Sequence, residues 1–130
     1  VKLNSIVHPA VKQHFNEWLL EHKNSPLVVY ESAILFESGS YKHCDIIITV
    51  VVPLEIRIKR VMQRDKISKE AVLKRIQQQW SDEQTIEKST FIIDNLSLES
   101  AKHQVNEIVK QLIILYTDVN IWLMYLRYKC

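Results

Sequence analysis

The sequence predicts an α/β fold built on a parallel sheet, and three observations lead to this class. A nearly continuous β-branched run follows Asp45 and covers residues 46–52, as in strands that are covered on both faces. Shorter β-prone runs lie at residues 27–34 and 90–93. Apolar residues at helical three-and-four spacing occur between and around these runs, so strands alternate with helices. The length of 130 residues, 47% of them hydrophobic, fits one compact domain.

The first 25 residues are predicted to be helical. Apolar residues recur from Leu3 to Leu19 with the spacing of an amphipathic helix. Because proline suits the first turn of a helix better than its middle, His8-Pro9 is expected to separate a short helix from a longer one. The strand expected at residues 27–34 ends in Leu35-Phe36-Glu37-Ser38-Gly39, a loop signature.

Residues 53–88 are predicted to form a helical hairpin or lid. Pro53 opens a helix to about Arg64, Ser68 caps another to about Gln79, and Ser81 begins a capping box for a short third helix. A last helix is marked by apolar residues from Leu98 to Leu112. The tail, residues 113–130, is apolar and rich in Tyr, Trp and Leu, and it could continue this helix, pack on a partner or be an atypical extension.

Composition argues against several classes of function. A net charge of +2 gives no electrostatic case for nucleic-acid binding. Cys44 and Cys130 lie far apart and outside any zinc or redox spacing, and the histidines lack metal-helix spacing, so no metal site is predicted. No uncharged apolar run approaches the ~20 residues of a membrane span, and no signal peptide opens the chain. A soluble, cytoplasmic protein with no membrane contact is expected.

Glycine is the most informative residue count, because the sequence has one, Gly39. Loops that cradle phosphate groups need several glycines, since backbone N–H groups must approach the phosphate without a Cβ in the way. The sequence therefore contains no such loop. The sequence also opens at Val1 in place of Met. Together these two observations predict that the sequence is only part of a longer chain.

Several charged side chains could carry chemistry. Arg57, Arg60 and Arg64 share one face of their predicted helix, and such a stripe could clamp an anion or be a solvated face paired with Glu55 or Asp65. Arg75 and Gln79 lie one turn apart on the next predicted helix. Acidic side chains near strand ends could hold Mg²⁺ or act as bases, or could reflect wet loops; they are Glu31, Glu37, Asp45 and Asp94.

Four segments in order resemble the signatures of dephospho-CoA kinases. They are Leu3-Asn4-Ser5-Ile6-Val7-His8-Pro9, Leu35-Phe36-Glu37-Ser38-Gly39, Arg60-Val61-Met62-Gln63-Arg64-Asp65 and Phe91-Ile92-Ile93-Asp94-Asn95. Arg75 and Gln79 match the R-I-x-x-Q of the same family. The resemblance covers residues 1–111 approximately, and the order and gaps of the four segments make it specific.

The resemblance implies a P-loop NTPase-like parallel sheet with flanking helices and a helical lid, incomplete at the N-terminus. It implies ATP- and Mg²⁺-dependent phosphorylation of the ribose 3′-hydroxyl of dephospho-CoA, in coenzyme A biosynthesis. Residues 1–25 would be a helical CoA-binding region and residues 53–88 the lid. The implied site residues are Arg60, Arg64 and Arg75 as catalytic phosphate contacts, His8, Pro9, Leu35, Phe36 and Glu37 as substrate-binding, and Asn95 as nucleotide-binding.

Departures from the family pattern limit this expectation. The P-loop and the aspartate that acts as general base lie N-terminal to anything in this sequence, so the chain alone is predicted to be inactive. Glu31-Ser32-Ala33-Ile34 and Ser89-Thr90 replace the usual residues before two motifs, and the tail has no match. The alternative function is a non-catalytic nucleotide- or CoA-binding or interaction module derived from the kinase fold. Self-association through an exposed strand edge or the tail is also predicted.

Overall fold

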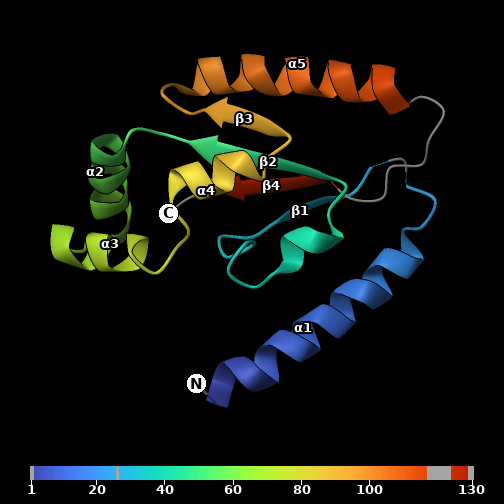
Figure 1. Ribbon diagram of the computed structural model, residues 1–130, viewed down its shortest axis with the longest axis horizontal. Coiled ribbons are helices and arrows are strands. Elements are labelled where there is room, and N and C mark those ends of the chain that lie inside the picture. Colours follow the sequence, from blue (N-terminus) through green and yellow to red (C-terminus); the bar gives the residue numbers. More distant parts are fainter. Residues whose placement is uncertain (1, 26, 117–123, 129–130) are drawn as a thin grey trace.

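The computed structural model describes residues 2–25, 27–116 and 124–128, with side chains over 9–25 and 27–114. It confirms the α/β class, with a small parallel sheet flanked by helices, consistent with a fragment of a P-loop kinase-like fold (Figure 1). Within this part of the chain the strands are β1 (Val29–Glu31), β2 (Ile46–Val51), β3 (Phe91–Asp94) and β4 (Met124–Tyr128). They pair in the order β1-β4-β2-β3, and each pair is parallel.

Apart from the short 3₁₀ helix at residues 40–43, the helices lie in the segments where the sequence predicts them. They are α1 (Lys2–Glu21), the short 3₁₀ helix η1 (Ser40–His43), α2 (Leu54–Asp65), α3 (Lys69–Ile76), α4 (Asp82–Glu87) and α5 (Leu98–Tyr116). Ser68 caps α3 by accepting a hydrogen bond from the Ala71 N–H, at 3.3 Å. Ser81 and Gln84 form the predicted capping box of α4. Local sequence signals therefore fix the starts of both helices.

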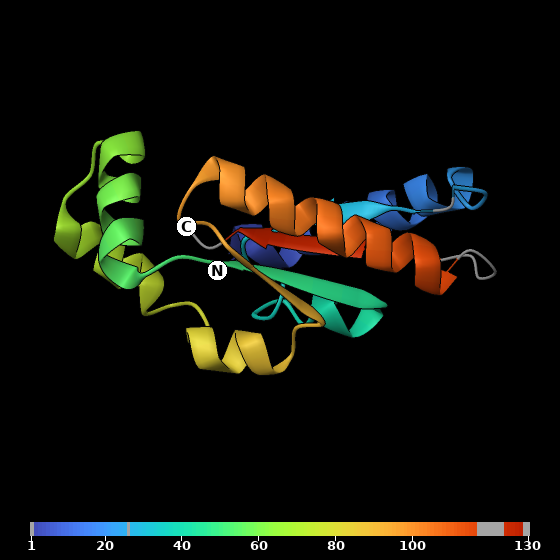
Figure 2. The same cartoon turned by 90° about the horizontal axis from the view of Figure 1, so that it is seen from above.

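Strand β2 is buried on both faces, as its β-branched run predicts. Ile46, Ile48 and Val50 point toward α5, where they pack with Ile108 and Leu112 among others. The next residues in the alternation point the other way: Ile47 packs with Leu35 and Phe36, and the Thr49 hydroxyl lies 2.6 Å from that of Ser89. Figure 2 shows α5 and α4 on opposite sides of the sheet. The core therefore has two halves separated by β2.

Three predicted boundaries were wrong. The helix α1 runs through His8-Pro9 without a break; Pro9 is exposed, where solvent can replace the one backbone hydrogen bond that proline removes. The first strand is three residues long and not eight, because the Ser32 hydroxyl accepts the Ile34 N–H at 3.2 Å and turns the chain. The helix expected to reach Gln79 ends at Ile76 and continues as a turn.

The C-terminal segment contributes a strand that the sequence analysis does not predict. Residues 113–116 continue α5, while residues 117–123 and 129–130 lie outside the described part. Strand β4 lies between β1 and β2 and pairs with both, with Leu126 opposite Glu31 on one side and Ile48 on the other. Among the strands described, β1 is bonded to β4 alone. Part of the predicted tail is thus central to the sheet.

The parallel arrangement gathers the carboxyl ends of the strands at one edge. The α2–α3 hairpin stands beside this edge, as Figure 1 shows, and it is held together by Ile58, Val61 and Val72. Ligands of parallel sheets bind at this edge. No helix within the described ranges has the length and hydropathy of a bilayer-crossing segment.

Candidate functional site

A large cleft lies between α1, the segment of residues 32–44 and the end of α3. We call it the α1 cleft. It encloses about 1130 Å³, a volume that exceeds most small-molecule pockets. Its lining residues are Pro9, Val11, Lys12, Phe15, Asn16, Leu19, Tyr30, Ser32, Ile34, Glu37, Ser38, Gly39, Ser40, His43, Cys44, Arg75, Gln78 and Gln79.

The walls of the α1 cleft combine aromatic and charged groups. Phe15 of α1 and Tyr30 of β1 have ring centroids 4.6 Å apart. Lys12, His43 and Arg75 bring basic groups to the lining from three different segments. Aromatic faces suit the stacking of a base, and cationic side chains suit phosphate groups. The lining of the cleft therefore includes both kinds of group, aromatic and cationic.

The predicted substrate segment divides between the core and the cleft. Leu35 and Phe36 are 0% and 2% exposed, and the Phe36 ring lies 5.3 Å from that of Trp80. Glu37 lines the cleft, and its Oε1 accepts a hydrogen bond from the Trp80 N–H at 2.7 Å. The burial of Leu35 and Phe36 thus fixes the position of Glu37, which faces the cleft.

Pro9, a predicted site residue, lines the cleft, whereas the side chain of His8 lies outside the described residues. Cys44, which was not among the predicted site residues, also lines the cleft. Burial, with a smaller effect of Asp45, raises the pKa of the Cys44 thiol to about 11. This thiol therefore stays protonated at neutral pH and is a poor nucleophile.

The three arginines of α2 do not form one stripe. Arg57 is 3% exposed and its Nη2 donates to Asp82 Oδ2 at 2.7 Å and to the Val52 carbonyl at 3.1 Å. It therefore joins α2 to α4 inside the protein. Arg60 turns instead to the end of β3, where its nitrogens donate to the carbonyls of Asn95 and Leu96 at 2.7 and 2.8 Å.

Arg64 and Arg75 are brought together by a carboxylate. Asp65 accepts from Arg64 Nε at 2.7 Å and Nη2 at 3.2 Å, and from Arg75 Nη1 at 2.7 Å. The pairing of Arg64 with Asp65 is one of the two arrangements that the spacing left open. Arg75, which also lines the α1 cleft, links this group to the cleft.

The carboxyl pKa of Asp65 is expected to report this pairing. Hydrogen bonds from Arg64 first and Arg75 second lower it from 3.8 to about 2. Because the folded-state pKa is depressed, the contribution to stability is complete above about pH 4 and is lost as the pH falls through about 2. We predict that carbon-detected NMR titration gives a midpoint near 2, and that Arg75→Gln moves it upward. An unchanged midpoint in that variant would contradict the Arg75 contact.

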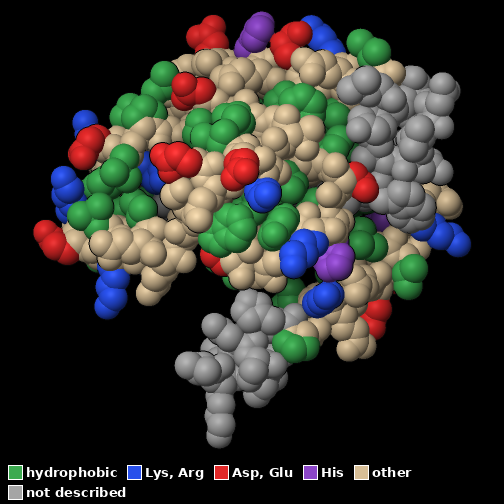
Figure 3. All heavy atoms as spheres, in the orientation of Figure 1, with side chains coloured by type: hydrophobic (Ala, Val, Ile, Leu, Met, Phe, Trp, Pro, Cys, Tyr) green, Lys and Arg blue, Asp and Glu red, His purple; other side chains and the backbone are tan. Residues whose placement is uncertain are grey.

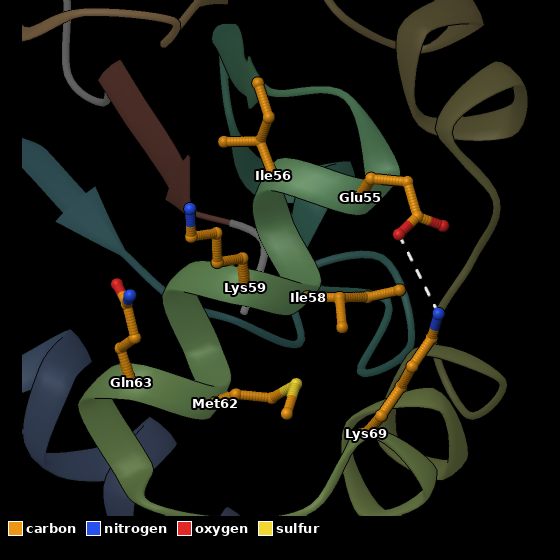
Figure 4. A pocket seen from close by; sticks show the side chains of 7 residues that line it. All are labelled: Glu55, Ile56, Ile58, Lys59, Met62, Gln63 and Lys69. Atoms are coloured by element: carbon orange, nitrogen blue, oxygen red, sulfur yellow. Dashed lines mark ion pairs between the residues drawn. The ribbon is translucent and has the colours of Figure 1, made fainter.

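A second, smaller groove of about 540 Å³ lies on the α2–α3 hairpin (Figure 4). Ile58 and Met62 face it, and the ion pair between Glu55 and Lys69, at 3.8 Å, spans one side. None of the predicted site residues lines it. Figure 3 shows basic and acidic side chains interspersed over the visible face, in keeping with the low net charge. Within the described residues, no three His, Cys, Asp or Glu side chains form a metal-binding group.

Comparison with known proteins assigns this chain to a family. The family model for dephospho-CoA kinase matches residues 1–100. The chain belongs to the dephospho-CoA kinase family. The resemblance seen in the four sequence segments is thereby confirmed.

Individual relatives agree with this assignment. A dephospho-CoA kinase of Bacteroides fragilis (strain YCH46) is 36% identical over 119 residues, covering 92% of this chain and 57% of that protein. One of Fusobacterium nucleatum subsp. nucleatum is 40% identical over 96 residues, covering 74% and 49%. One of Novosphingobium aromaticivorans is 33% identical over 110 residues, covering 84% and 55%. The chain spans about half the length of the curated relatives it matches.

Some lining residues of the α1 cleft were missed by the sequence analysis. Phe15 reads as part of the apolar face of an amphipathic helix, which is the usual signature of a core residue, and Tyr30 reads as part of a strand. Lys12 reads as a solvent-facing residue on the opposite side. Their proximity depends on how α1 lies against β1, and no local pattern carries that information.

Proposed function

We propose that this chain supplies the acceptor-binding region and the lid of an ATP-dependent kinase that phosphorylates the ribose 3′-hydroxyl of dephospho-CoA. The observation that carries this proposal is the α1 cleft, whose aromatic and cationic lining belongs to a chain of the dephospho-CoA kinase family. Dephospho-CoA joins an adenine base to a diphosphate, and both groups match this lining.

The α1 cleft would receive the acceptor. The expected CoA-binding region, residues 1–25, would supply one wall through α1, with Pro9 and Phe15 in the described lining and His8 assigned by the family motif. Glu37 stands on the opposite wall, held by the Trp80 N–H. Leu35 and Phe36 would act by fixing the position of Glu37, since both are buried in the core.

The arginines would stabilise the transferred group. In the reaction, the ribose 3′-oxygen bonds to the γ-phosphorus of ATP, the bond to the β,γ-bridging oxygen breaks, and the hydroxyl proton passes to a base. Arg64 and Arg75 would offset charge on the phosphoryl oxygens. Arg60 would act from the β3 edge, where Asn95 would lie close to the adenine of ATP.

The helices of residues 53–88 would close over the bound substrates as a lid. Closure would exclude water, which competes with the ribose hydroxyl for the phosphoryl group. Mg²⁺ would accompany ATP, and no group of three or more His, Cys, Asp or Glu side chains among the described residues could hold it. The cytoplasmic location and the self-association stay predictions from the sequence.

The chain by itself would bind without turnover. Its single glycine cannot build a phosphate-cradling loop, and the family resemblance places the general base N-terminal to this sequence. We expect isothermal titration calorimetry to show that the chain binds dephospho-CoA. An assay with ATP and dephospho-CoA should detect no product, and intact mass should confirm the chain under study.

Matched variants test where binding occurs. Phe15→Ala and Arg75→Gln, both in the cleft lining, should weaken dephospho-CoA binding by about tenfold each. Lys102→Gln on the exposed surface of α5 removes a charge elsewhere and should leave affinity unchanged. Equal effects from all three substitutions, or no binding by the unmodified chain, would contradict the proposal. Binding with no turnover even beside a supplied family P-loop segment would favour the non-catalytic module.

A further inference from the structure

Asp65 is the one acidic side chain among the described residues that accepts hydrogen bonds from two of the predicted phosphate-binding arginines. Arg64 reaches it from the last turn of α2, and Arg75 reaches it from the last turn of α3. Asp65 Oδ2 accepts from both guanidinium groups. One oxygen therefore fixes the spacing between cations that belong to different helices.

Helix stability does not explain this carboxylate. Asp65 is the last residue of α2, where the negative end of the helix dipole disfavours an acid. The next residue, Lys66, has φ of 52°, a left-handed conformation that residues other than glycine rarely adopt. Exposed ion pairs add little stability. The position of Asp65 at the end of α2 therefore does not by itself account for an acid there.

The two arginines remain accessible while they are held. Arg64 and Arg75 are 59% and 53% exposed, and the group of two cations and one anion keeps a net positive charge. A long arginine side chain loses much of its rotamer freedom when it is fixed. A carboxylate that fixes both side chains before an anion arrives removes part of that cost from binding.

The other arginines of α2 make a useful contrast. Arg57 is buried against Asp82, and Arg60 lies on two backbone carbonyls at the end of β3. Only Arg75, of the predicted phosphate contacts in the described residues, lines the α1 cleft. Asp65 therefore connects the cleft to the end of α2 through Arg75.

We propose that Asp65 is a positioning residue that holds Arg64 and Arg75 in the arrangement that binds the phosphate groups of the substrates. This inference rests on the proposed function, which assigns those arginines to phosphate binding. It predicts that removing the Asp65 carboxylate lowers the affinity for an anion, whereas electrostatics alone predicts that the affinity rises. Removing a carboxylate beside an anion site should strengthen anion binding by Coulomb's law, whereas loss of positioning should weaken it.

The test measures binding of inorganic triphosphate to the full chain by isothermal titration calorimetry at 0.15 M salt. Asp65→Ala should weaken binding by about tenfold, despite the added positive charge. Asp65→Glu keeps the charge but lengthens the side chain, and it should also weaken binding. Asp65→Asn keeps an acceptor of the same size and should recover part of the affinity. Thermal unfolding of each variant shows whether it is folded at the assay temperature.

Three outcomes separate this inference from the function on which it rests. Weaker binding in both Asp65→Ala and Asp65→Glu, with Arg75→Gln also weaker, supports it. Unchanged or tighter binding in Asp65→Ala, with Arg75→Gln weaker, overturns the role of Asp65 and leaves the arginine site in place. No triphosphate binding by the unmodified chain overturns both, because the arginines then hold no phosphate.

Discussion

Phe36→Ala is expected to lower the free energy of unfolding by about 3–5 kcal/mol. Phe36 is 2% exposed and packs against both Tyr41 and Trp80, with ring centroids 5.2 and 5.3 Å away. Alanine leaves a cavity in the half of the core that supports the α1 cleft, and the surrounding rings can fill it only in part. Chemical denaturation followed by tryptophan fluorescence measures the change.

A surface leucine supplies the control for this substitution. Leu20→Ala removes an apolar side chain that is 70% exposed, so stability should change by about 0.5 kcal/mol or less. The same pair of variants also tests the predicted substrate role of Phe36. Loss of dephospho-CoA binding without loss of stability would show that the Phe36 ring contacts the ligand directly and does not act as a core residue.

Leu126→Pro is expected to destabilise the sheet strongly, although less than Phe36→Ala lowers the stability of the core. Leu126 lies in β4 between Glu31 and Ile48, and proline cannot donate to a central ladder. The carbonyl that loses its donor costs up to about 3 kcal/mol when it is buried. Because β1 joins the described sheet through β4, hydrogen exchange should accelerate at Tyr30 as well as around residue 126.

Leu126→Val separates backbone from side-chain effects. Valine keeps the N–H and favours strands, so hydrogen exchange at Tyr30 should match that of the unmodified chain. Equal protection of Tyr30 in the proline variant would mean that β1 does not depend on β4 for its place in the sheet.

Elements with a local signal were predictable from the sequence. The capped starts of α3 and α4 depend on Ser68 and Ser81, which act within one turn, and the buried strand β2 is set by its β-branched run. Boundaries failed where exposure decided the outcome, as at Pro9. Strand β4 was not predicted for a different reason. Its partner strands lie far away in the sequence, so no local window shows whether it joins the sheet.

The candidate site was predictable as a set of residue types but not as an arrangement. The helical spacing placed Arg57, Arg60 and Arg64 together, yet their partners on other elements pull them to three different places: Asp82, the β3 edge and Asp65. The sequence offered Asp65 as an ion-pair partner within its own helix, but not as a link to Arg75 on the next helix. A side chain that works by joining two others becomes visible only when both helices are in place.

The position of β4 has a consequence for the order of folding. Val29 pairs with Met124, 95 positions later in the chain. During synthesis, β1 emerges before β4 and cannot pair with it until the 95 positions that lead to Met124 have been made. Pairings of such long range are slow, because a large loop must close before any contact forms. Until then the early strand offers unpaired backbone groups to other chains, so dilution and chaperones should raise the yield of folded protein.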